Sequence, residues 1–363
     1  MVTTKFPNQM KAWLLEDFNA PYVLREQPLP SIDNPNDVHI RVDACSYCHT
    51  DAVVAAGTVV RPSLPHVGCH EYAGTIVALP SGQAECHGFR VSDIVGVRGC
   101  GNHMCGQCRE CKDPSPPLPY PPGLSVYCPH AGAGLGIDRS GKFREYAAVD
   151  GRQIAKLPEG LSAVDAAPLM CAGLTVYSAL AKCSLKPGDR LGVMGCGGGL
   201  GHLALQFATK MGLKTTGIDV NPRALQLARE LGTGATIIDA SKEAAKETLP
   251  QQIGLDAVLI LPETQQPFDY GMELVRDGGL VMLLSFPTEG FHVSAIDIVL
   301  RRVRLEGSLI GSNRAMNDRL DFCVRHGVRA KTTTYEFGQL NNLVDDFHKR
   351  TPGKLVLDMA KTD

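Results

Sequence analysis

Residues 190–211 read RLGVMGCGGGLGHLALQFATKM, and this stretch decides the fold of the second half of the chain. An apolar run precedes a glycine cluster, Gly195, Gly197, Gly198, Gly199 and Gly201, and a helical pattern follows it. Such glycines allow a tight turn, and the helix N-terminus offers free N–H groups to a pyrophosphate. The spacing departs from G-x-G-x-x-G because Leu200 stands three positions after Gly197. The motif alone therefore fits a structural turn equally well.

The residues around this turn alternate between strand and helix patterns. They predict strands at 214–218, 257–261 and 280–284 and a helix at 222–231. This order favours right-handed crossovers and a parallel sheet, so we expect a doubly wound α/β domain.

An acidic residue follows the next predicted strand. Asp219 stands eighteen residues after Gly201, where a carboxylate can accept hydrogen bonds from both ribose hydroxyls of a dinucleotide. The same carboxylate would repel a 2′-phosphate, so NAD is favoured over NADP. Arg223 lies nearby and either weakens that preference or is simply solvated.

The first half of the chain has a different sequence pattern. From about residue 11 to 150 it is punctuated by glycine and proline, with β-rich runs at 38–42 and 72–77. After residue 302 a β-rich pattern returns, with a helix predicted at 318–324 and a strand at 354–358. We therefore expect a mostly β domain from 1–165 and 303–363 and a nucleotide domain from 166–302. Residues 113–123 hold six prolines and predict a stiff surface excursion.

Composition excludes several classes of function. The net charge of −2 offers no basic stripe for nucleic acid and no polybasic anchor for a membrane. The N-terminus lacks a secretory pattern and no apolar run approaches a membrane span, so we expect a cytoplasmic protein without a membrane partner. The thirteen cysteines are clustered, which fits metal ligands better than a disulfide framework.

The densest cysteine cluster predicts a zinc site. Cys105, Cys108 and Cys111 stand at C-x-x-C spacing, and Cys128 follows after sixteen residues. Cys100 is a rival for the fourth ligand. Such a closed site is structural, and the scarcity of basic residues around it argues against a nucleic-acid zinc ribbon. Upstream, Cys48, His70 and Glu71 indicate a second zinc site, so we expect two Zn²⁺ per subunit.

Three further motifs carry a family resemblance: CSYCHTD at 45–51, GCHE at 68–71 and PLMCAG at 168–173. With them the chain resembles the zinc-dependent alcohol dehydrogenases of the medium-chain dehydrogenase/reductase superfamily, over nearly its whole length. The resemblance implies a GroES-like catalytic domain beside a Rossmann NAD-binding domain. It also implies an alcohol or aldehyde substrate and a homodimer or homotetramer.

The resemblance assigns roles to single residues. Cys48, His70 and Cys171 hold the catalytic zinc and leave one position open, and Glu71 approaches the metal during ligand exchange. Thr50 contacts the substrate oxygen and starts proton release, whereas Asp51 fixes the tautomer of His70. The alternative for Cys171, judged without its motif, is buried packing.

Two more residues are implied on the cofactor side. His49 resembles a residue that contacts the cofactor phosphate, and Lys354 stands where the family places an arginine against the pyrophosphate. The alternative for Lys354 is a solvated residue at the start of a strand.

The chain also departs from the family. Val53 occupies a position where many relatives have a histidine at the end of the proton relay, so release must run from Thr50 through the ribose, with His49, to water. Residues 96–100 and Val59 replace bulky aromatic residues, which predicts a substrate larger than ethanol. The alternative is a reductase of specialised metabolism acting on a cyclic hemiacetal or an enone aldehyde, with NADPH as a possible cofactor. A non-catalytic nucleotide-binding scaffold is disfavoured because no ligand is lost.

Overall fold

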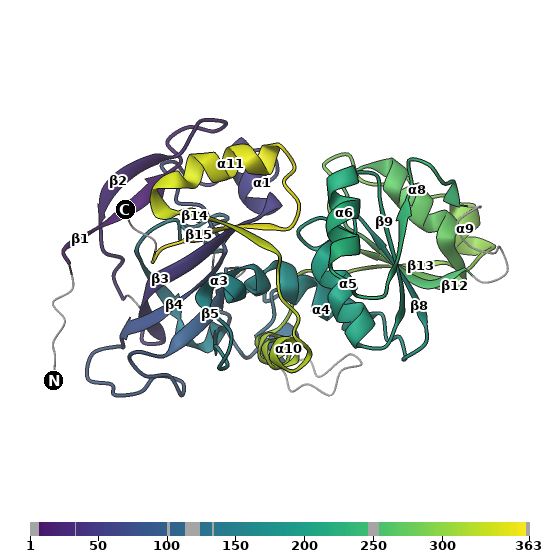
Figure 1. Cartoon of the computed structure of the whole chain (residues 1–363). Helices are drawn as coiled ribbons and strands as arrows, with labels where there is room; N and C mark the ends of the chain where they lie inside the picture. The colour runs from purple at the N-terminus through teal and green to yellow at the C-terminus, as the bar shows by residue number, and fades with distance from the viewer. Residues whose placement is uncertain are drawn as a thin grey trace.

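The computed structural model describes residues 7–32, 34–99, 102–112, 124–132, 134–245 and 254–360. It has two lobes, each built around one large sheet, and the first and last described strands, β1 and β15, lie in the first lobe (Figure 1). The proline-rich segment 113–123 and Cys100 fall outside the described residues, so the predictions for them remain untested.

The first lobe holds a seven-stranded sheet of order β14-β15-β3-β4-β5-β7, with β6 paired to β3. Alternate residues of β3, among them Val38, Ile40 and Val42, are buried in its core. A separate antiparallel pair, β1 and β2, packs its Trp13 and Leu14 side chains on the same core. The strands are β1 Gln9–Leu14, β2 Val23–Pro28, β3 Asp37–Tyr47, β4 Glu71–Ala78, β5 Ile94–Arg98, β6 Tyr146–Asp150, β7 Ile154–Lys156, β14 Thr332–Glu336 and β15 Lys354–Asp358.

The C-terminal tail rejoins this first sheet, as its β-rich pattern predicts. Strand β15 pairs antiparallel with β3, which brings Leu355 opposite Tyr47. The parallel partner of β15 is β14, reached through η3 (Phe337–Gln339) and the amphipathic helix α11 (Leu340–His348). Leu340 and Leu343 bury one face of α11 in the core of the first lobe.

The second lobe holds a six-stranded parallel sheet of order β10-β9-β8-β11-β12-β13, which confirms the predicted α/β class. Its strands are β8 Arg190–Met194, β9 Lys214–Asp219, β10 Thr236–Asp239, β11 Leu255–Ile260, β12 Val275–Leu283 and β13 Arg304–Gly307. The order reverses between β8 and β11, and ligands of such sheets bind at the carboxyl ends of strands flanking this reversal. Strand β13, at residues 304–307, pairs with β12 and is the edge strand of this parallel sheet, although the sequence pattern places these residues in the first domain.

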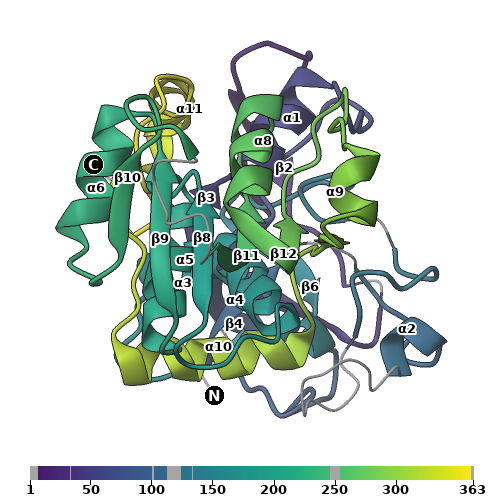
Figure 2. The ribbon, with the colours of Figure 1, turned by 90° about the vertical axis from the view of Figure 1, so that its right-hand side faces the viewer.

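Helices cover both faces of the parallel sheet (Figure 2). In β11, Ala257 and Leu259 face a core shared with α4 and α5, whereas Val258 and Ile260 face a core shared with α8. A strand buried on both faces reads as a continuous apolar run, which explains why these segments are so hydrophobic. The helices of this lobe are α5 Gly201–Lys210, α6 Pro222–Glu230, α8 Gln265–Leu274 and α9 Ala295–Val299.

The remaining helical segments lie between strands of the first lobe or connect the two lobes. They are α1 His49–Ala56, α2 Arg109–Lys112, η1 Gly151–Gln153, α3 Ala163–Ala166, η2 Ala167–Met170, α4 Ala172–Lys182 and α10 Asn313–His326. Helix α10 is longer than the predicted 318–324, because Ser312 caps its N-terminus by accepting a hydrogen bond from Ala315 N at 3.2 Å.

Within the described residues no single helix has both the length and the apolar composition to cross a membrane. The consecutive segments Ala163–Met170 and Ala172–Lys182 meet that test only when taken together, and they are bent by 50°.

Candidate functional site

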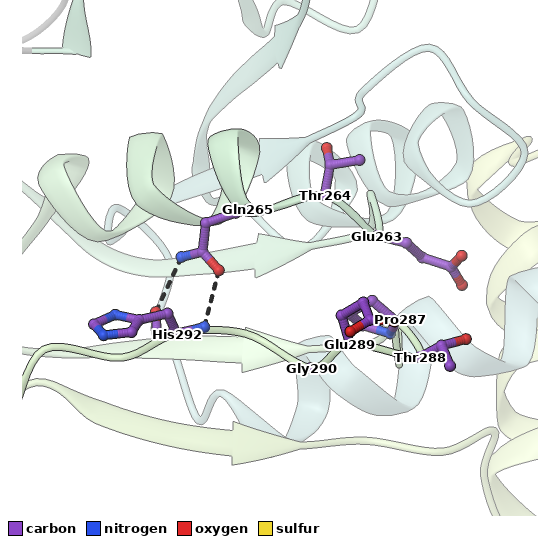
Figure 3. A pocket seen from close by; sticks show the side chains of 8 residues that line it. All are labelled: Glu263, Thr264, Gln265, Pro287, Thr288, Glu289, Gly290 and His292. Atoms are coloured by element: carbon purple, nitrogen blue, oxygen red, sulfur yellow. Dashed lines mark hydrogen bonds between the residues drawn. The ribbon is translucent and has the colours of Figure 1, made fainter.

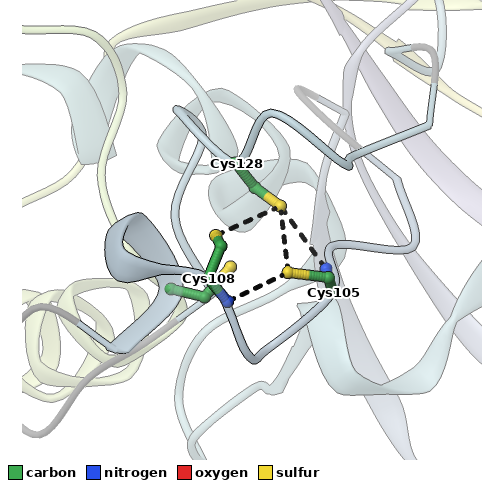
Figure 4. Close-up of side chains that lie close together, drawn as sticks. Cys105, Cys108 and Cys128 are labelled. Carbon is green, nitrogen blue, oxygen red and sulfur yellow. Dashed lines mark hydrogen bonds between the residues drawn. The ribbon is translucent and has the colours of Figure 1, made fainter.

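The four clustered cysteines form one compact group in the first lobe (Figure 4). The sulfur of Cys128 lies 3.6 Å from that of Cys105 and 3.8 Å from that of Cys108. Four sulfurs bound to one tetrahedral zinc at 2.3 Å would be separated by about 3.8 Å. With Cys111, the set therefore has the dimensions of a tetrahedral zinc site, and Cys128 reaches it despite the long insertion.

The local backbone favours the thiolate form of Cys105. Cys105 Sγ accepts hydrogen bonds from Gln107 N and Cys108 N at 3.4 and 3.3 Å. These bonds, the one from Gln107 first, lower the pKa of Cys105 to about 6. A thiolate is the form that binds zinc, so the turn prepares the metal ligand.

A second group joins three segments far apart in the sequence. Cys48 precedes α1, His70 directly precedes β4, and Cys171 precedes α4, and their ligand atoms all lie within 4.8 Å of one another. All three side chains are buried. The predicted ligands therefore meet where the N-termini of α1 and α4 lie next to the start of β4 in the seven-stranded sheet.

Asp51 holds two of these ligands in place. Its Oδ2 atom accepts a hydrogen bond from Cys48 N at 2.8 Å, and its Oδ1 atom lies 3.2 Å from His70 Nδ1 and accepts from Cys69 N at 3.0 Å. Because the carboxylate occupies Nδ1, the free nitrogen of His70 is Nε2. This is the geometry by which a buried carboxylate fixes a metal-bound imidazole.

The residues of this second group fit a zinc ion. The Nε2 atom of His70 is buried, and no described residue forms a hydrogen bond with it, which is costly unless something else binds it. The pKa of Cys48 lies well below its ordinary value, first because of the hydrogen bond with Cys171 and then because of the nearby charges of Lys354 and His70. Two sulfurs and one imidazole are a known ligand set of catalytic zinc.

Directly behind the ligands lies a buried ion pair. The Nζ atom of Lys354 bonds to Glu71 Oε1 and, at 2.9 Å, to Tyr47 O. Burial raises the pKa of Glu71 to about 7 although Lys354 opposes the shift. Burial alone would lower the pKa of Lys354, yet Glu71 and the neighbouring thiols raise it overall. Only 4% of Lys354 is exposed, so the alternative of a solvated lysine is wrong.

The glycine turn ends β8 and starts α5. Gly195 has a φ of +75°, and side chains at Gly197 and Gly201 would come within 2.0 Å of the carbonyls of Ala224 and Gly195. These positions exclude any larger residue. A Cβ atom added to Gly199, by contrast, would lie nearest to Cδ of Lys354, at a distance of 3.2 Å. The turn thus lies beside the ion pair behind the metal ligands.

Asp219 lies at the carboxyl end of β9, as expected for a ribose ligand. Its Oδ2 atom accepts a hydrogen bond from Gly197 N at 3.2 Å, and its Oδ1 atom accepts from Val220 N and Asn221 N. Arg223 is exposed and donates to Lys349 O at 2.6 Å. Its guanidinium is therefore engaged with the chain after α11 and does not pair with Asp219.

His49 faces the second lobe across the interface between the two. Its Nε2 atom lies 2.9 Å from Oε2 of Glu263, just after β11. Glu263 also lines an open pocket of about 560 Å³, together with Thr288, Glu289 and His292 (Figure 3). Sequence reasoning missed Glu263, although its position beyond the carboxyl end of a parallel strand was a usable signal.

The structure describes the surroundings of several residues in the segments where the sequence departs from the family. The hydroxyl of Thr50 lies 4.0 Å from the sulfur of Cys48, and Val53 is half-buried on α1.

In the stretch 96–100, Gly99 packs against His70, and a Cβ atom added to Gly99 would lie 2.5 Å from the Cβ atom of His70. Arg98 is not small: it is 1% exposed and donates to Leu124 O at 2.7 Å and to Gly311 O.

Comparison with known proteins covers both lobes. Residues 34–159 match the family "Alcohol dehydrogenase GroES-like domain", and residues 199–325 match the family "Zinc-binding dehydrogenase". The curated alcohol dehydrogenase of Geobacillus stearothermophilus is 30% identical over 355 residues, which are 97% of this chain and 100% of that protein.

Solved structures agree with these matches. Acetophenone reductase from Geotrichum candidum, in complex with NAD, gives a TM-score of 0.84 at 25% identity and covers 98% of both chains. The alcohol dehydrogenase of Aeropyrum pernix gives a TM-score of 0.84 at 26% identity and covers 96% of this chain and 99% of that one. The first matched range contains Cys48, His70 and the four clustered cysteines, and the second begins at Gly199.

Proposed function

We propose, for a chain that belongs to the zinc-type alcohol dehydrogenase family, that the buried group of Cys48, His70 and Cys171 is its catalytic centre. The family makes the protein an oxidoreductase that acts on alcohols and carbonyls with zinc and a nicotinamide cofactor. The observation that carries the proposal is the buried, unpartnered Nε2 of His70 between two sulfurs. A bound zinc ion would supply a Lewis acid that polarises the substrate oxygen.

The residues around this centre have separate roles in the proposal. Thr50 hydrogen-bonds the substrate oxygen and passes its proton outward, and Asp51 keeps Nε2 of His70 free for the metal. Glu71 acts as the transient zinc ligand, and it is bonded to Lys354 when it does not bind the metal. Because Val53 has no titratable group, the proton leaves towards the exposed ring of His49 and then to water.

The cofactor in the proposal is NAD, bound along the glycine turn from Gly195 to Gly201. Asp219 supports this choice because its carboxylate would meet the ribose hydroxyls and repel a 2′-phosphate. Arg223 does not offset that repulsion, since it bonds to Lys349 O. His49 and Lys354 are proposed to contact the cofactor phosphates.

The substrate in the proposal is a carbonyl compound larger than acetaldehyde. Val59 supports this, because valine stands there in place of a bulky aromatic residue. A structural relative of this chain is named for the reduction of acetophenone, an aryl ketone. We therefore favour aryl or otherwise bulky aldehydes and ketones.

One set of assays tests these assignments together. Acetaldehyde, benzaldehyde and acetophenone are reduced with NADH or NADPH, before and after chelation, and zinc is counted per subunit. We expect two zinc ions, higher kcat/KM for the aryl substrates, and NADH preferred. Cys48→Ser should keep one zinc and lose activity by about 10³-fold or more, because the Lewis acid is worth several kcal/mol. Full turnover in Cys48→Ser would refute the proposed centre.

We also propose a homo-oligomer formed through the second lobe. Helix α9 and the residue after it expose Ile296, Val299 and Leu300, which are 64%, 69% and 73% accessible. Beside them β13 is the edge strand of the parallel sheet, and a second copy could cover both features. Sedimentation of the wild type should give a dimer or tetramer, whereas Val299→Glu with Leu300→Lys should give monomers.

The domain boundaries of the proposal follow the sheets. The first domain comprises 1–165 together with the tail beyond β13, and the nucleotide domain comprises 166–307. Limited proteolysis that cuts first near these limits would support them.

A further inference from the structure

A cavity of about 180 Å³ lies in the first lobe, lined by residues other than the predicted metal and cofactor ligands. Its wall includes Arg139, Arg144, Ser140, Ser31, Asn102 and Asp37. It lies between the residues that precede β3 and the segment that leads into β6. A space of this size with several polar partners holds water molecules or a small ion.

Two arginines line the cavity, Arg139 and Arg144, and neither forms an ion pair with a carboxylate in the part of the chain that the structure describes. The Nε atom of Arg144 is buried without a hydrogen-bond partner, and Arg139 is close enough to act on it electrostatically. Two positions before Arg144, Lys142 is fully buried, and its Nζ atom makes no hydrogen bond with any described residue. Burying a guanidinium or an ammonium group costs several kcal/mol when nothing compensates the charge.

Among the residues that line the cavity, two guanidinium groups face a single carboxylate. The carboxylate of Asp37 lies on the wall, but its Oδ1 atom is bonded to His103 Nε2 at 2.6 Å. The Nζ atom of Lys142 lies 5.6 Å from the ring centre of Tyr72, and such an aromatic contact carries no net charge.

The protonation behaviour of the cations agrees with this picture. Burial, with Arg139 adding repulsion, lowers the pKa of Arg144 to about 10. Burial also lowers the pKa of Lys142 well below its ordinary value, and Arg144 adds to the shift. An anion in the cavity would relieve both groups.

We infer that this cavity is a binding site for a small oxyanion, phosphate or a short carboxylate, held by Arg144, Arg139 and Ser140. A guanidinium offers a planar fork of donors that matches the oxygens of either class. The hydroxyls of Ser31 and Ser140, at the wall, supply further donors.

The site lies behind the segment that carries His70. Lys142 N donates to Gly68 O at 2.7 Å, and Leu135 N donates to Gly99 O at 2.8 Å. A side chain on Gly136 would come within 2.1 Å of Cys69 O, so the two segments are in direct contact. An anion bound at Arg139 and Arg144 therefore stabilises the wall against which the metal-ligand segment packs.

The test is thermal unfolding of the zinc-loaded protein saturated with NADH, so that the cofactor's own phosphate sites are filled. Inorganic phosphate, or sodium acetate, is compared with sodium chloride at equal ionic strength. At tenfold the dissociation constant, phosphate or acetate should raise Tm by about 2–4 °C beyond chloride. Arg139→Gln and Arg144→Gln should lose this shift, whereas Arg90→Gln, an exposed arginine of the same lobe, should keep it.

Two further experiments provide for an Arg144 variant that does not fold and locate the bound anion directly. If Arg144→Gln does not fold, the exposed Arg139 and the half-exposed Ser140 carry the test as Arg139→Gln and Ser140→Ala. Crystals soaked in selenate should show an anomalous peak beside Arg144. Shifts equal to those in chloride for both anions, or shifts that Arg139→Gln retains in full, would overturn the inference without touching the proposed activity.

Discussion

The ammonium group of Lys354 is bonded to the carboxylate of Glu71 in the interior of the first lobe, although 283 residues separate them in the sequence. Lys354 is 4% exposed and Glu71 is fully buried. The pair joins the start of β15 to the start of β4, directly behind the Cys48 and Cys171 sulfurs. Removing either partner leaves a buried charge without compensation.

A double-mutant cycle measures this pair. Glu71→Gln and Lys354→Met should each destabilise the protein by about 3–5 kcal/mol, because each leaves its partner's charge buried and unpaired. The double variant should recover most of that loss. Chemical unfolding with zinc in excess gives the four free energies. If the two single losses simply add in the double variant, the two charges are not coupled.

A second prediction concerns the contact between His49 and Glu263. His49 cannot bond to a cofactor phosphate and to Glu263 with the same nitrogen, so Glu263 competes with the cofactor in the proposed scheme. Both side chains are partly exposed, which keeps the pair weak. Glu263→Gln should therefore lower the Kd of NADH by about threefold.

The matched variant for that contact is His49→Gln, which should raise the Kd of NADH by a similar or larger factor. Fluorescence titration measures both values. Unaltered NADH affinity in Glu263→Gln and in His49→Gln would show that neither side chain takes part in cofactor binding.

The proton path gives a third prediction. Val53 leaves no titratable group on α1 after Thr50 and Asp51, so added small-molecule base should accelerate the wild type. Val53→His should reduce this dependence and raise kcat near neutral pH by a few-fold, with a new ionisation in the pH–rate profile. A profile identical to that of the wild type would count against release through this side of the site.

Several of these features were predictable because they are local. The glycine turn, Asp219 and the three metal motifs lie in short segments whose spacing reflects one turn or one strand end. The periodicities of 214–218, 222–231 and 354–358 likewise correspond to β9, α6 and β15. In such segments the local sequence and the tertiary environment favour the same structure.

Other features depend on how distant segments meet. The contact of His49 with Glu263 spans 214 residues and exists only where the lobes face each other. The burial of Arg98 depends on the carbonyls of Leu124 and Gly311, which no spacing rule links to it. Strand β13 could not be placed in the parallel sheet from the sequence, because RLEG alternates poorly and three of its four residues are exposed at the sheet edge.

The four-cysteine site yields a fourth prediction. Cys128→Ser should remove one zinc ion per subunit and leave the other in place, since the two groups share no ligand. The loss of stability should be on the order of several kcal/mol, because binding to a structural site is coupled to folding. Zinc counting and thermal unfolding check both parts. Retention of two zinc ions would show that another residue completes the site.

A buried histidine at the start of α5 gives the last prediction. His202 is fully buried, donates from Nδ1 to Gly198 O at 2.9 Å and accepts at Nε2 from Lys331 N at 3.1 Å. Burial, together with the charges of Lys354 and Lys331, lowers its pKa to about 4. An unfolded histidine has a pKa of about 6.5.

The sign of the effect follows from these two pKa values. Between pH 6.5 and 4 the unfolded chain binds a proton at His202 and the folded protein does not, so stability falls as the pH is lowered. From pH 7 to 4.5 the contribution lost is about 2–3 kcal/mol. His202→Gln should reduce the acid sensitivity of unfolding by that amount, whereas His326→Gln, an exposed residue of α10, should leave it unchanged. Equal slopes in the wild type and His202→Gln would mean that His202 is protonated in the fold, in conflict with its bond to Lys331 N.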